Sequence, residues 1–315
     1  MGVFVFLPLI LPLTALPIAR LAEQHLHPRT AARLLTAVAV ILAVCSTVCL
    51  CLLVVVGTAQ LPGNPLPDSW SDPEVREAVP HDEIAGKLSI VALMAVVLAC
   101  GLTLHRDRRY RTRAHRALAG LGTSSEVAVL SDDAPYAYAL PGAPGRILVS
   151  TGMLAALTDT ERHALLAHER AHLHGHHHRL LLAVRLASRA NPLLRPLREA
   201  VGYCTERWAD EEAARATGDR RTTARAVGRA ALVSGPRPSA RTVFRGLAAF
   251  AEAGPVPRRV AALLRPGPPV NSWPPTLTSA GLAAIVAAAG AAASTFSALN
   301  AAVALFLVLE AATYG

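Results

Sequence analysis

His168-Glu169-Arg170-Ala171-His172 holds two histidines four residues apart, with a glutamate directly after the first. Residues four apart lie on one face of a helix, so both imidazoles can reach a single Zn²⁺ at about 2.0–2.1 Å. Glu169 points partly aside, where its carboxylate can hold a water molecule and take its proton. The pattern is typical of zinc hydrolases and predicts His168 and His172 as metal ligands and Glu169 as the catalytic base.

Other histidines crowd the same region and leave a plainer explanation open, because a histidine-rich tract can bind metal adventitiously. They are His163, His174, His176, His177 and His178. We expect His163 on the surface, off the stripe formed by the two ligands. We expect the other four at or past the end of the motif helix, in a solvated turn.

The motif lies in a segment with clear helix signals. Thr158-Asp159-Thr160-Glu161 is a capping box, which predicts the start of a helix that runs through His174. Gly175 suits the C-terminal cap of that helix. A further helix is expected from His178 through Arg185, with a break near Asn191-Pro192.

Three apolar runs precede this segment, at residues 3–19, 34–56 and 88–104. The chain is 52% hydrophobic and only 17% charged, and the runs predict three membrane-spanning helices. The first run contains three prolines, so we expect a kinked span there. No basic residue precedes this run, and a cleaved signal peptide is therefore not expected.

Arginines follow two of these runs. A small group follows the first run, and a larger one follows the third: Arg20, Arg29 and Arg33, then Arg106, Arg108, Arg109, Arg111, Arg113 and Arg116. The loop between the second and third runs is acidic instead. The positive-inside rule places both arginine groups in the cytoplasm and the N-terminus and the acidic loop outside. We expect the larger group to rest against anionic lipid head groups.

The net charge of +9 raises the question of a nucleic-acid partner. The sequence has no basic patch interleaved with aromatic residues and no known nucleic-acid motif, so no direct nucleic-acid partner is expected. Its five cysteines include no Cys-x-x-Cys pair, and four of them lie in apolar runs. We expect free thiols and no disulfide.

Three short runs between the larger arginine group and the motif predict β-strands, at residues 126–130, 136–140 and 146–150. Such a sheet can offer an edge at Ala137, Tyr138 and Ala139, where an extended peptide substrate adds as another strand. Packing of Tyr136 and Tyr138 on the helices explains the same residues equally well. Both interpretations stay open at this point.

A catalytic zinc site usually has three protein ligands and one open position, so a third ligand is needed from a distant segment. The candidates are Glu199, Glu206, Asp210, Glu211 and Glu212. Glu206 and Asp210 lie one turn apart on a helix that we expect to end near Gly218. Glu206 can bind zinc while Asp210 accepts the N–H of a ligand histidine. An ordinary acidic helix face is the alternative, and it describes Glu211 and Glu212 well.

The remaining chain predicts further helices and a proline-rich linker that contains Trp273; the helices lie at residues 219–233, 242–253 and 256–264. Arg258 or Arg259 can pair with an acid there, but we expect both on a solvated surface. Residues 277–309 are apolar and longer than one span requires. They predict either one span followed by a surface helix or a hairpin of two spans. We prefer the first, with a break near Ser297 and Asn300.

Four segments in this order resemble bacterial membrane metallopeptidases: residues 135–142, residues 147–152, His168-Glu-x-x-His172 and Glu206-x-x-x-Asp210. The order resembles the HtpX and CAAX prenyl endopeptidase group, and still more the BlaR/MecR-type antirepressor peptidases. The second resemblance implies three spans, a cytoplasmic gluzincin domain and a fourth span. It also implies zinc bound by His168, His172 and Glu206, with Glu169 as the base. The antibiotic sensors continue into an extracellular penicillin-binding domain that is absent here, so we expect no β-lactam sensing by that route.

We therefore expect a mainly α membrane protein in three parts: three spans at residues 1–104, a cytoplasmic α+β zinc peptidase domain at 105–275, and a C-terminal span and helix at 276–315. The C-terminus is expected outside the cell. The predicted function is a zinc endopeptidase that cleaves a cytoplasmic protein in signal transduction. By resemblance, the substrate is a winged-helix repressor of the BlaI/MecI type. The alternatives are an HtpX-like quality-control protease of membrane proteins and a non-catalytic signal transducer that binds metal for structure.

Overall fold

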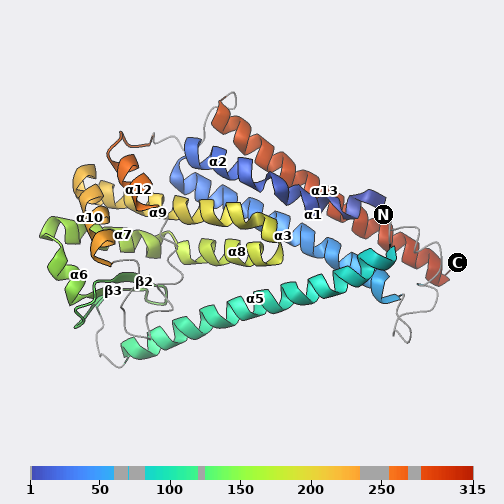
Figure 1. Cartoon of the computed structure of the whole chain (residues 1–315), viewed down its shortest axis with the longest axis horizontal. Helices are drawn as coiled ribbons and strands as arrows, with labels where there is room; N and C mark the ends of the chain where they lie inside the picture. The colour runs from blue at the N-terminus through green and yellow to red at the C-terminus, as the bar shows by residue number, and fades with distance from the viewer. Residues whose placement is uncertain are drawn as a thin grey trace.

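The computed structural model describes residues 2–59, 70, 82–119, 125–234, 255–268 and 278–314. Helices dominate the fold, and one small sheet lies at the end of the molecule away from both termini (Figure 1). Most of the predicted acidic loop, the predicted helix at residues 242–253 and Trp273 lie outside the described residues.

The N-terminal apolar run is divided into four short helices: η1 (Gly2–Val5), α1 (Leu7–Ile10), η2 (Leu11–Thr14) and α2 (Ala15–His25). Pro8 and Pro12 each lie in the first turn of a new helix. Proline lacks an N–H and clashes with the preceding helical turn, so a helix ends before each proline and another begins. The run therefore forms four short helices in place of the single kinked span that we predicted.

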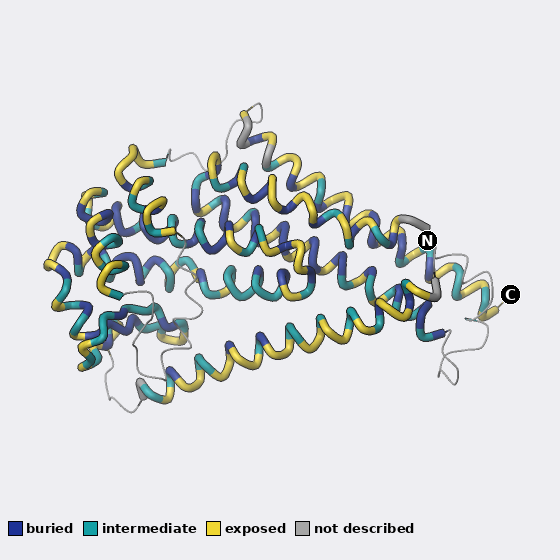
Figure 2. Tube along the Cα trace, in the orientation of Figure 1, coloured by how far each residue is buried: buried dark blue, intermediate teal, exposed yellow. Residues whose placement is uncertain are grey.

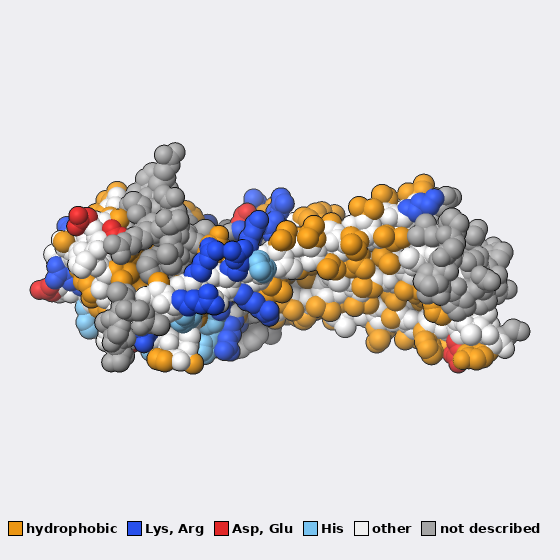
Figure 3. Space-filling view, turned by 90° about the horizontal axis from the view of Figure 1, so that it is seen from below, with side chains coloured by type: hydrophobic (Ala, Val, Ile, Leu, Met, Phe, Trp, Pro, Cys, Tyr) orange, Lys and Arg blue, Asp and Glu red, His pale blue; other side chains and the backbone are white. Residues whose placement is uncertain are grey.

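Within the described residues, three helices contain segments long and apolar enough to cross a membrane: α3 (Pro28–Ala59), α5 (Asp82–Ala119) and α13 (Ser279–Tyr314). These helices are compatible with a multi-pass membrane protein. Arginine side chains form a band between the apolar half and the half that contains the sheet (Figure 3). Such a band marks the level of the lipid head groups in membrane proteins.

The predicted break near Ser297 and Asn300 is wrong, because α13 is one continuous helix. Its small polar side chains form hydrogen bonds that leave the helix intact. The Ser297 hydroxyl donates to the Phe4 carbonyl at 2.7 Å, and the Thr295 hydroxyl donates to the Ala291 carbonyl at 2.9 Å. A hydroxyl that is satisfied against its own or a neighbouring helix does not interrupt helical structure.

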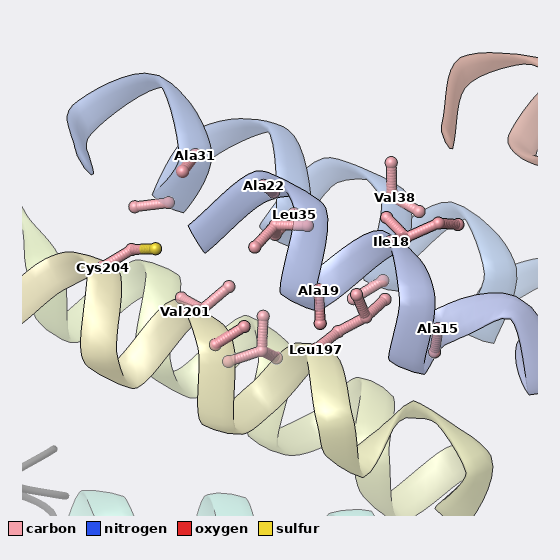
Figure 4. Close-up of a cluster of buried hydrophobic side chains, with 14 of the residues drawn as sticks. Ala15, Ile18, Ala19, Ala22, Ala31, Leu35, Val38, Leu197, Val201 and Cys204 are labelled. Carbon is pink, nitrogen blue, oxygen red and sulfur yellow. The ribbon is translucent and has the colours of Figure 1, made fainter. Parts of the chain in front are cut away.

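An extended apolar core joins α2 and α3 to α9 (Arg195–Thr217) (Figure 4). Its side chains include Ala15, Ile18, Ala19 and Ala22 from α2, Leu35 and Val38 from α3, and Leu197, Val201 and Cys204 from α9. The alanines let the helix axes approach closely. This core fixes α9, which carries the predicted third metal ligand, against α3, a helix long and apolar enough to cross a membrane. All five cysteines are free thiols, as expected.

α5 packs against the rest of the protein much less than α3 does. Of the 18-residue apolar stretch that could cross a membrane, 6% is buried in α5 and 44% in α3. It crosses α3 where Gly57 and Gly86 meet; a Cβ on Gly57 would lie 2.6 Å from the Gly86 backbone. From there α5 diverges from the bundle toward the sheet, largely exposed (Figures 1 and 2). It continues without a break through the larger arginine group, so the predicted boundary at residue 104 falls inside one helix.

The sheet contains β1 (Val127–Leu130), β2 (Ala137–Leu140) and β3 (Arg146–Ser150) in the order β1-β3-β2. β1 pairs with β3 in parallel, and β2 pairs with β3 antiparallel. The three predicted strands are confirmed to within one residue. β2 lies at an edge of the sheet, where the sequence predicted a place for substrate. The helix α6 (Thr151–Ala156) follows β3 directly.

The helix signals around the motif are confirmed. α7 (Asp159–His174) begins at the capping box, in which Glu161 accepts from the Thr158 N–H at 2.9 Å. The later helices are α8 (His177–Ala190), η4 (Pro192–Leu194), α9, α10 (Arg220–Ser234) and α12 (Val256–Leu263). α9 ends at Gly218, whose φ of 67° is the left-handed conformation that favours glycine. Together these elements bring α7 and α9 side by side.

Candidate metal centre

Three side chains from α7 and α9 converge beside the sheet. His168, His172 and Glu206 place their ligand atoms within 4.8 Å of one another. The two Nε2 atoms lie 3.1 Å apart, and Glu206 oxygens lie 3.6 Å from His168 Nε2 and 3.4 Å from His172 Nε2. In a tetrahedral zinc site the ligand atoms are about 3.3 Å apart, since each lies about 2.0–2.1 Å from the ion. The donor types and their spacing therefore fit a metal ion of this geometry.

Two further residues, Asp210 and Arg259, contact the candidate ligands on the sides away from the ligand atoms or pair with their carboxylates. Asp210 Oδ1 lies 3.1 Å from His168 Nδ1, on the opposite side of the ring from the ligand atom. Arg259 of α12 contacts Glu206 at 2.8 Å through Nη1 and binds both oxygens of Asp210, at 2.7 and 2.8 Å. An outer carboxylate on a ligand histidine selects the tautomer whose Nε2 lone pair faces the metal. The predicted arrangement of Glu206 and Asp210 is present in this geometry.

The expectation of a solvated Arg259 is wrong, because α12 packs on α9 and directs this side chain onto two buried carboxylates. Arg259 is 6% exposed. Its neighbour Arg258 is on the surface as expected, where it pairs with Glu23 at 2.9 Å. The sequence around the two arginines contains nothing that separates the buried one from the exposed one.

The expectation of four solvated histidines after the motif is wrong for His177, which is fully buried. Its Nδ1 lies 2.9 Å from Nδ1 of His172, and its ring packs on Trp208 with centroids 4.4 Å apart. Two local features allow this. His176 has a φ of 49°, which turns the chain, and a Cβ on Gly175 would lie 2.6 Å from Cδ2 of His177. Burial, followed by the charge of His172, lowers the pKa of His177 to about 2, so the ring is neutral.

The other histidines lie where the sequence predicted or close to it. His163, His174 and His176 are exposed, and His178 is partly buried at the wall of the pocket described below. The position of His177, five residues after His172 and directly past a glycine turn, was the available signal for its role.

The other acidic candidates for the third ligand lie outside the three-ligand group. Glu199 is exposed. Glu211 is buried and pairs with Arg207 at 2.9 Å and also with Arg220, so it is not the ordinary solvated residue that we expected. Glu212 pairs with Arg215 at 2.7 Å. Glu206 is therefore the acid of α9 that belongs to the site.

The electrostatics of the site favour a positive charge between the ligands. Burial opposes a charge on His168, but its hydrogen bonds to Asp210 and Glu206 raise its pKa to about 10. Burial lowers the pKa of His172 to about 4. Burial also opposes the charge of Glu206, yet Arg259 and His172 hold its pKa well below the usual range. Two ionised carboxylates that attract a proton to His168 present the same attraction to a metal cation.

Glu169 lies beside this group in a pocket of about 190 Å³. The pocket is bounded by β2, α7, α8 and α5; its lining includes Ala137, Tyr138, Ala139, His168, Glu169, His172, His178, Arg185, Glu206, Asp107 and Arg111. The Glu169 carboxylate accepts a hydrogen bond from the Ala139 N–H. Burial raises the pKa of Glu169, against an opposing effect of His168. A buried carboxylate with a raised pKa is suited to accept and return a proton.

Within the described residues no strand pairs with the outer edge of β2, and this edge lines the pocket. Ser150 N–H donates to the Tyr136 carbonyl at 3.0 Å, so Tyr136 and Tyr138 direct their backbone groups toward β3. Ala137 and Ala139, which alternate with them, direct theirs outward, and Ala139 N–H reaches Glu169. Tyr136 is itself buried in a core cluster, as the packing interpretation predicted, and substrate binding along this strand stays a prediction. The Tyr136 side chain packs in the core cluster, and the outer backbone edge of β2 lines the pocket.

Residues 104–194 match Peptidase family M48, whose members are metal-dependent. The matched segment contains the outer part of α5, the sheet, α7 and α8. Glu206, Asp210 and Arg259 lie beyond it, so their place in the site rests on the geometry. No curated protein and no solved structure matches the chain. Over the segment that carries its two histidines and Glu169, the chain is similar to the M48 metallopeptidases.

Proposed function

We propose that the protein is an integral membrane zinc endopeptidase. The observation that carries this proposal is the joint placement of three ligand atoms, one buried glutamate and the free edge of a β-strand in a single pocket. A structural metal site needs the ligands alone. The strand edge and Glu169 are the additional parts that peptide hydrolysis requires.

His168, His172 and Glu206 are the residues that would hold the zinc ion. When bound, the ion supplies Lewis acidity toward the scissile carbonyl and toward water. Glu169 takes a proton from the attacking water and passes it to the nitrogen of the departing amine. The outward backbone groups of Ala137 and Ala139 hold the peptide extended beside Glu169. Asp210, His177 and Arg259 keep the three ligands oriented.

We propose a cytoplasmic protein as the substrate, and by the BlaR/MecR resemblance a winged-helix repressor of the BlaI/MecI type. The topology proposed with it has the N- and C-termini outside and the peptidase region in the cytoplasm. The arginine band supports this orientation through the positive-inside rule. The oligomeric state is not part of the proposal.

One observation favours a second candidate, an HtpX-like quality-control protease of membrane proteins. The pocket wall opposite the ligands is α5, a membrane-spanning helix, with Asp107 and Arg111 at the lining. A pocket bounded by such a helix is close enough to the bilayer to receive segments of membrane proteins. Cysteine labelling of the segment between α3 and α5 separates the candidates, since an intracellular position there would overturn the proposed topology.

The central test compares wild type with Glu169→Gln in full-length protein purified in detergent. We expect both proteins to bind one zinc per chain, while cleavage of an unfolded model substrate falls by at least about a thousandfold in the variant. Glu199→Gln, which changes an exposed acid of α9, is the matched control and should cleave like wild type. Undiminished cleavage by Glu169→Gln would overturn the assigned mechanism. A fully active protein without metal would overturn the zinc assignment.

A further inference from the structure

Two arginines at the start of α3 converge on one tryptophan of α9. The guanidinium groups of Arg29 and Arg33 each lie over the Trp208 ring, with Cζ 5.3 Å from its centroid. Both side chains are exposed, and within the described part of the chain neither has a carboxylate partner. Two like charges on one ring repel each other. Their arrangement is therefore suited to a bound anion that neutralises both.

Cavities lie on both sides of this arginine pair. The larger has a volume of about 970 Å³ and also includes His27, Arg215 and Arg220 in its lining. A second cavity of about 470 Å³ adjoins the outer face of α7, and Arg170 contributes to it. Both cavities are lined mainly by cationic and small side chains, so an anion can enter from either side.

The acidic residues near these cavities are already engaged. Glu211 is 3% exposed and pairs with Arg207 and Arg220. Glu212 accepts from Arg215 at 2.7 Å and from Trp208 Nε1 at 3.1 Å. Neither Glu211 nor Glu212 therefore neutralises the positive charge of Arg29 and Arg33.

The pair lies at the level of the membrane surface. Arg33 directly precedes Leu34, where the apolar part of α3 begins. Figure 3 shows a band of Lys and Arg side chains on one face of the molecule, between the apolar half and the sheet-containing half. Lipid phosphates occupy this level of a bilayer, next to the first residues of a spanning helix.

We propose that Arg29, Arg33 and the cavity that they share with Arg215 and Arg220 bind the phosphate head group of an anionic phospholipid. Arginine presents parallel N–H donors that fit phosphate oxygens, and its planar group stacks on the indole at the same time. Basic pockets beside spanning helices on the cytoplasmic side are typical lipid head-group sites. The site is separate from the metal centre and does not depend on catalysis, although Trp208 also contacts His177.

The test uses delipidated full-length protein in a non-ionic detergent. Three probes are titrated: a short-chain phosphatidylglycerol, the matching phosphatidylcholine and inorganic phosphate. Bound lipid is counted by native mass spectrometry, and the unfolding temperature is followed in parallel. We expect phosphatidylglycerol to bind and to raise the unfolding temperature, with a much weaker response to the other two. Equal binding of phosphatidylcholine, or an equal effect of free phosphate, would overturn the assignment to an anionic lipid.

Two pairs of variants locate the site. Arg29→Gln with Arg33→Gln should weaken phosphatidylglycerol binding by about tenfold or more, because charge-assisted hydrogen bonds are lost. Arg221→Gln with Arg225→Gln removes the same charge from exposed positions on α10, outside both cavities, and should bind lipid like wild type. Arg29→Lys with Arg33→Lys keeps the charge and guards against a folding defect; it should bind better than the glutamine pair. Equal losses in the α3 and α10 glutamine pairs would show a diffuse charge effect and contradict a defined site.

Discussion

The two walls of the pocket beside the candidate metal ligands are built in opposite ways. On the wall formed by α7 and α9, buried charges are paired across three helices: Arg259 of α12 joins Glu206 and Asp210 of α9, and Asp210 supports His168 of α7. On the α5 wall, the ion pair is local, between Asp107 and Arg111 one turn apart. α5 also buries little of its surface against the rest of the protein.

This difference separates the parts that fix geometry from the part that borders substrate. Buried charge pairs are costly to disturb and hold atoms in place, because a separated charge would lie without solvent. Local pairs near the surface contribute little to stability. We therefore expect substitutions on the α7–α9 wall to change metal binding and stability, and substitutions on the α5 wall to leave both nearly unchanged.

The largest effect is expected for Arg259→Met. The substitution leaves Asp210 and Glu206 buried with one fewer cation, and breaking a buried pair in this way costs about 3–5 kcal/mol. Thermal unfolding of the metal-free protein in detergent measures the loss. Arg258→Met is the matched control, since its pair with Glu23 is exposed and should contribute less than about 1 kcal/mol. Equal effects of the two substitutions would contradict the contrast between buried and exposed pairs.

The same pair predicts a pH dependence with a definite sign. Burial opposes the charge of Asp210, but Arg259 and His168 lower its pKa, and the pKa of Glu206 is also lowered. A depressed carboxylate pKa contributes stability above the unfolded value of about 4, and this contribution is lost as pH falls further. In Arg259→Met the buried carboxylates of Asp210 and Glu206 lack their arginine, so they destabilise the folded protein while they are ionised. The stability difference between wild type and variant should therefore narrow from pH 7 toward pH 4; a constant difference would contradict this account.

His177→Ala tests the outer support of a ligand without removing a ligand. Loss of such a support typically lowers metal affinity by about 10- to 100-fold, and we expect a change in this range in competition with a chelator. Gly175→Ala should act in the same direction, because its methyl group would displace the His177 ring. His163→Ala changes an exposed histidine within α7 and serves as the control. Unchanged affinity in both His177→Ala and Gly175→Ala would show that the contact with His172 has no role in metal binding.

Local patterns were sufficient to predict the parts of this protein whose causes are local. The capping box at Thr158, the strands and the spacing of His168 and His172 depend on neighbouring residues, and the structure confirms them. The pattern of Glu206 and Asp210 was predictable for the same reason. The outer part of the site was not, because the contact of Arg259 with α9 depends on how two helices pack.

The errors have the same origin. His177 was assigned to solvent because its helix begins only after the turn at His176, and the sequence does not show where that turn directs the chain. The break expected at Ser297 is absent because the serine hydroxyl finds the carbonyl of Phe4, almost the whole chain away. The partner of His177 is His172, five residues away across a turn, and the partner of Ser297 lies on another helix; neither contact can be read from composition alone.

Ala137→Pro tests the edge strand with a smaller expected effect. Proline removes the outward N–H of Ala137 and leaves the ladder with β3 intact, as proline is tolerated on edge strands. We expect kcat/KM for a peptide substrate to fall by about tenfold, mainly through KM, with zinc content unchanged. Val129→Ala is the control, since it changes an exposed side chain of β1, and it should leave kcat/KM unchanged. A normal KM in Ala137→Pro would remove this edge as the place where substrate binds.

The smallest effect is expected for Asp107→Asn on the α5 wall. The substitution breaks the pair with Arg111. The Asp107 side chain is only 12% exposed, but asparagine keeps an acceptor oxygen and the Arg111 side chain stays 27% exposed to water, so the loss of stability should be about 1 kcal/mol. Metal affinity should not change, because Asp107 is absent from the three-ligand group. Arg111 then faces the pocket without its partner, and we expect substrates with an acidic side chain near the cleaved bond to gain relative to neutral ones. A strong loss of zinc or stability would mean that α5 supports the metal centre as firmly as α9 does, and the contrast between the two walls would be wrong.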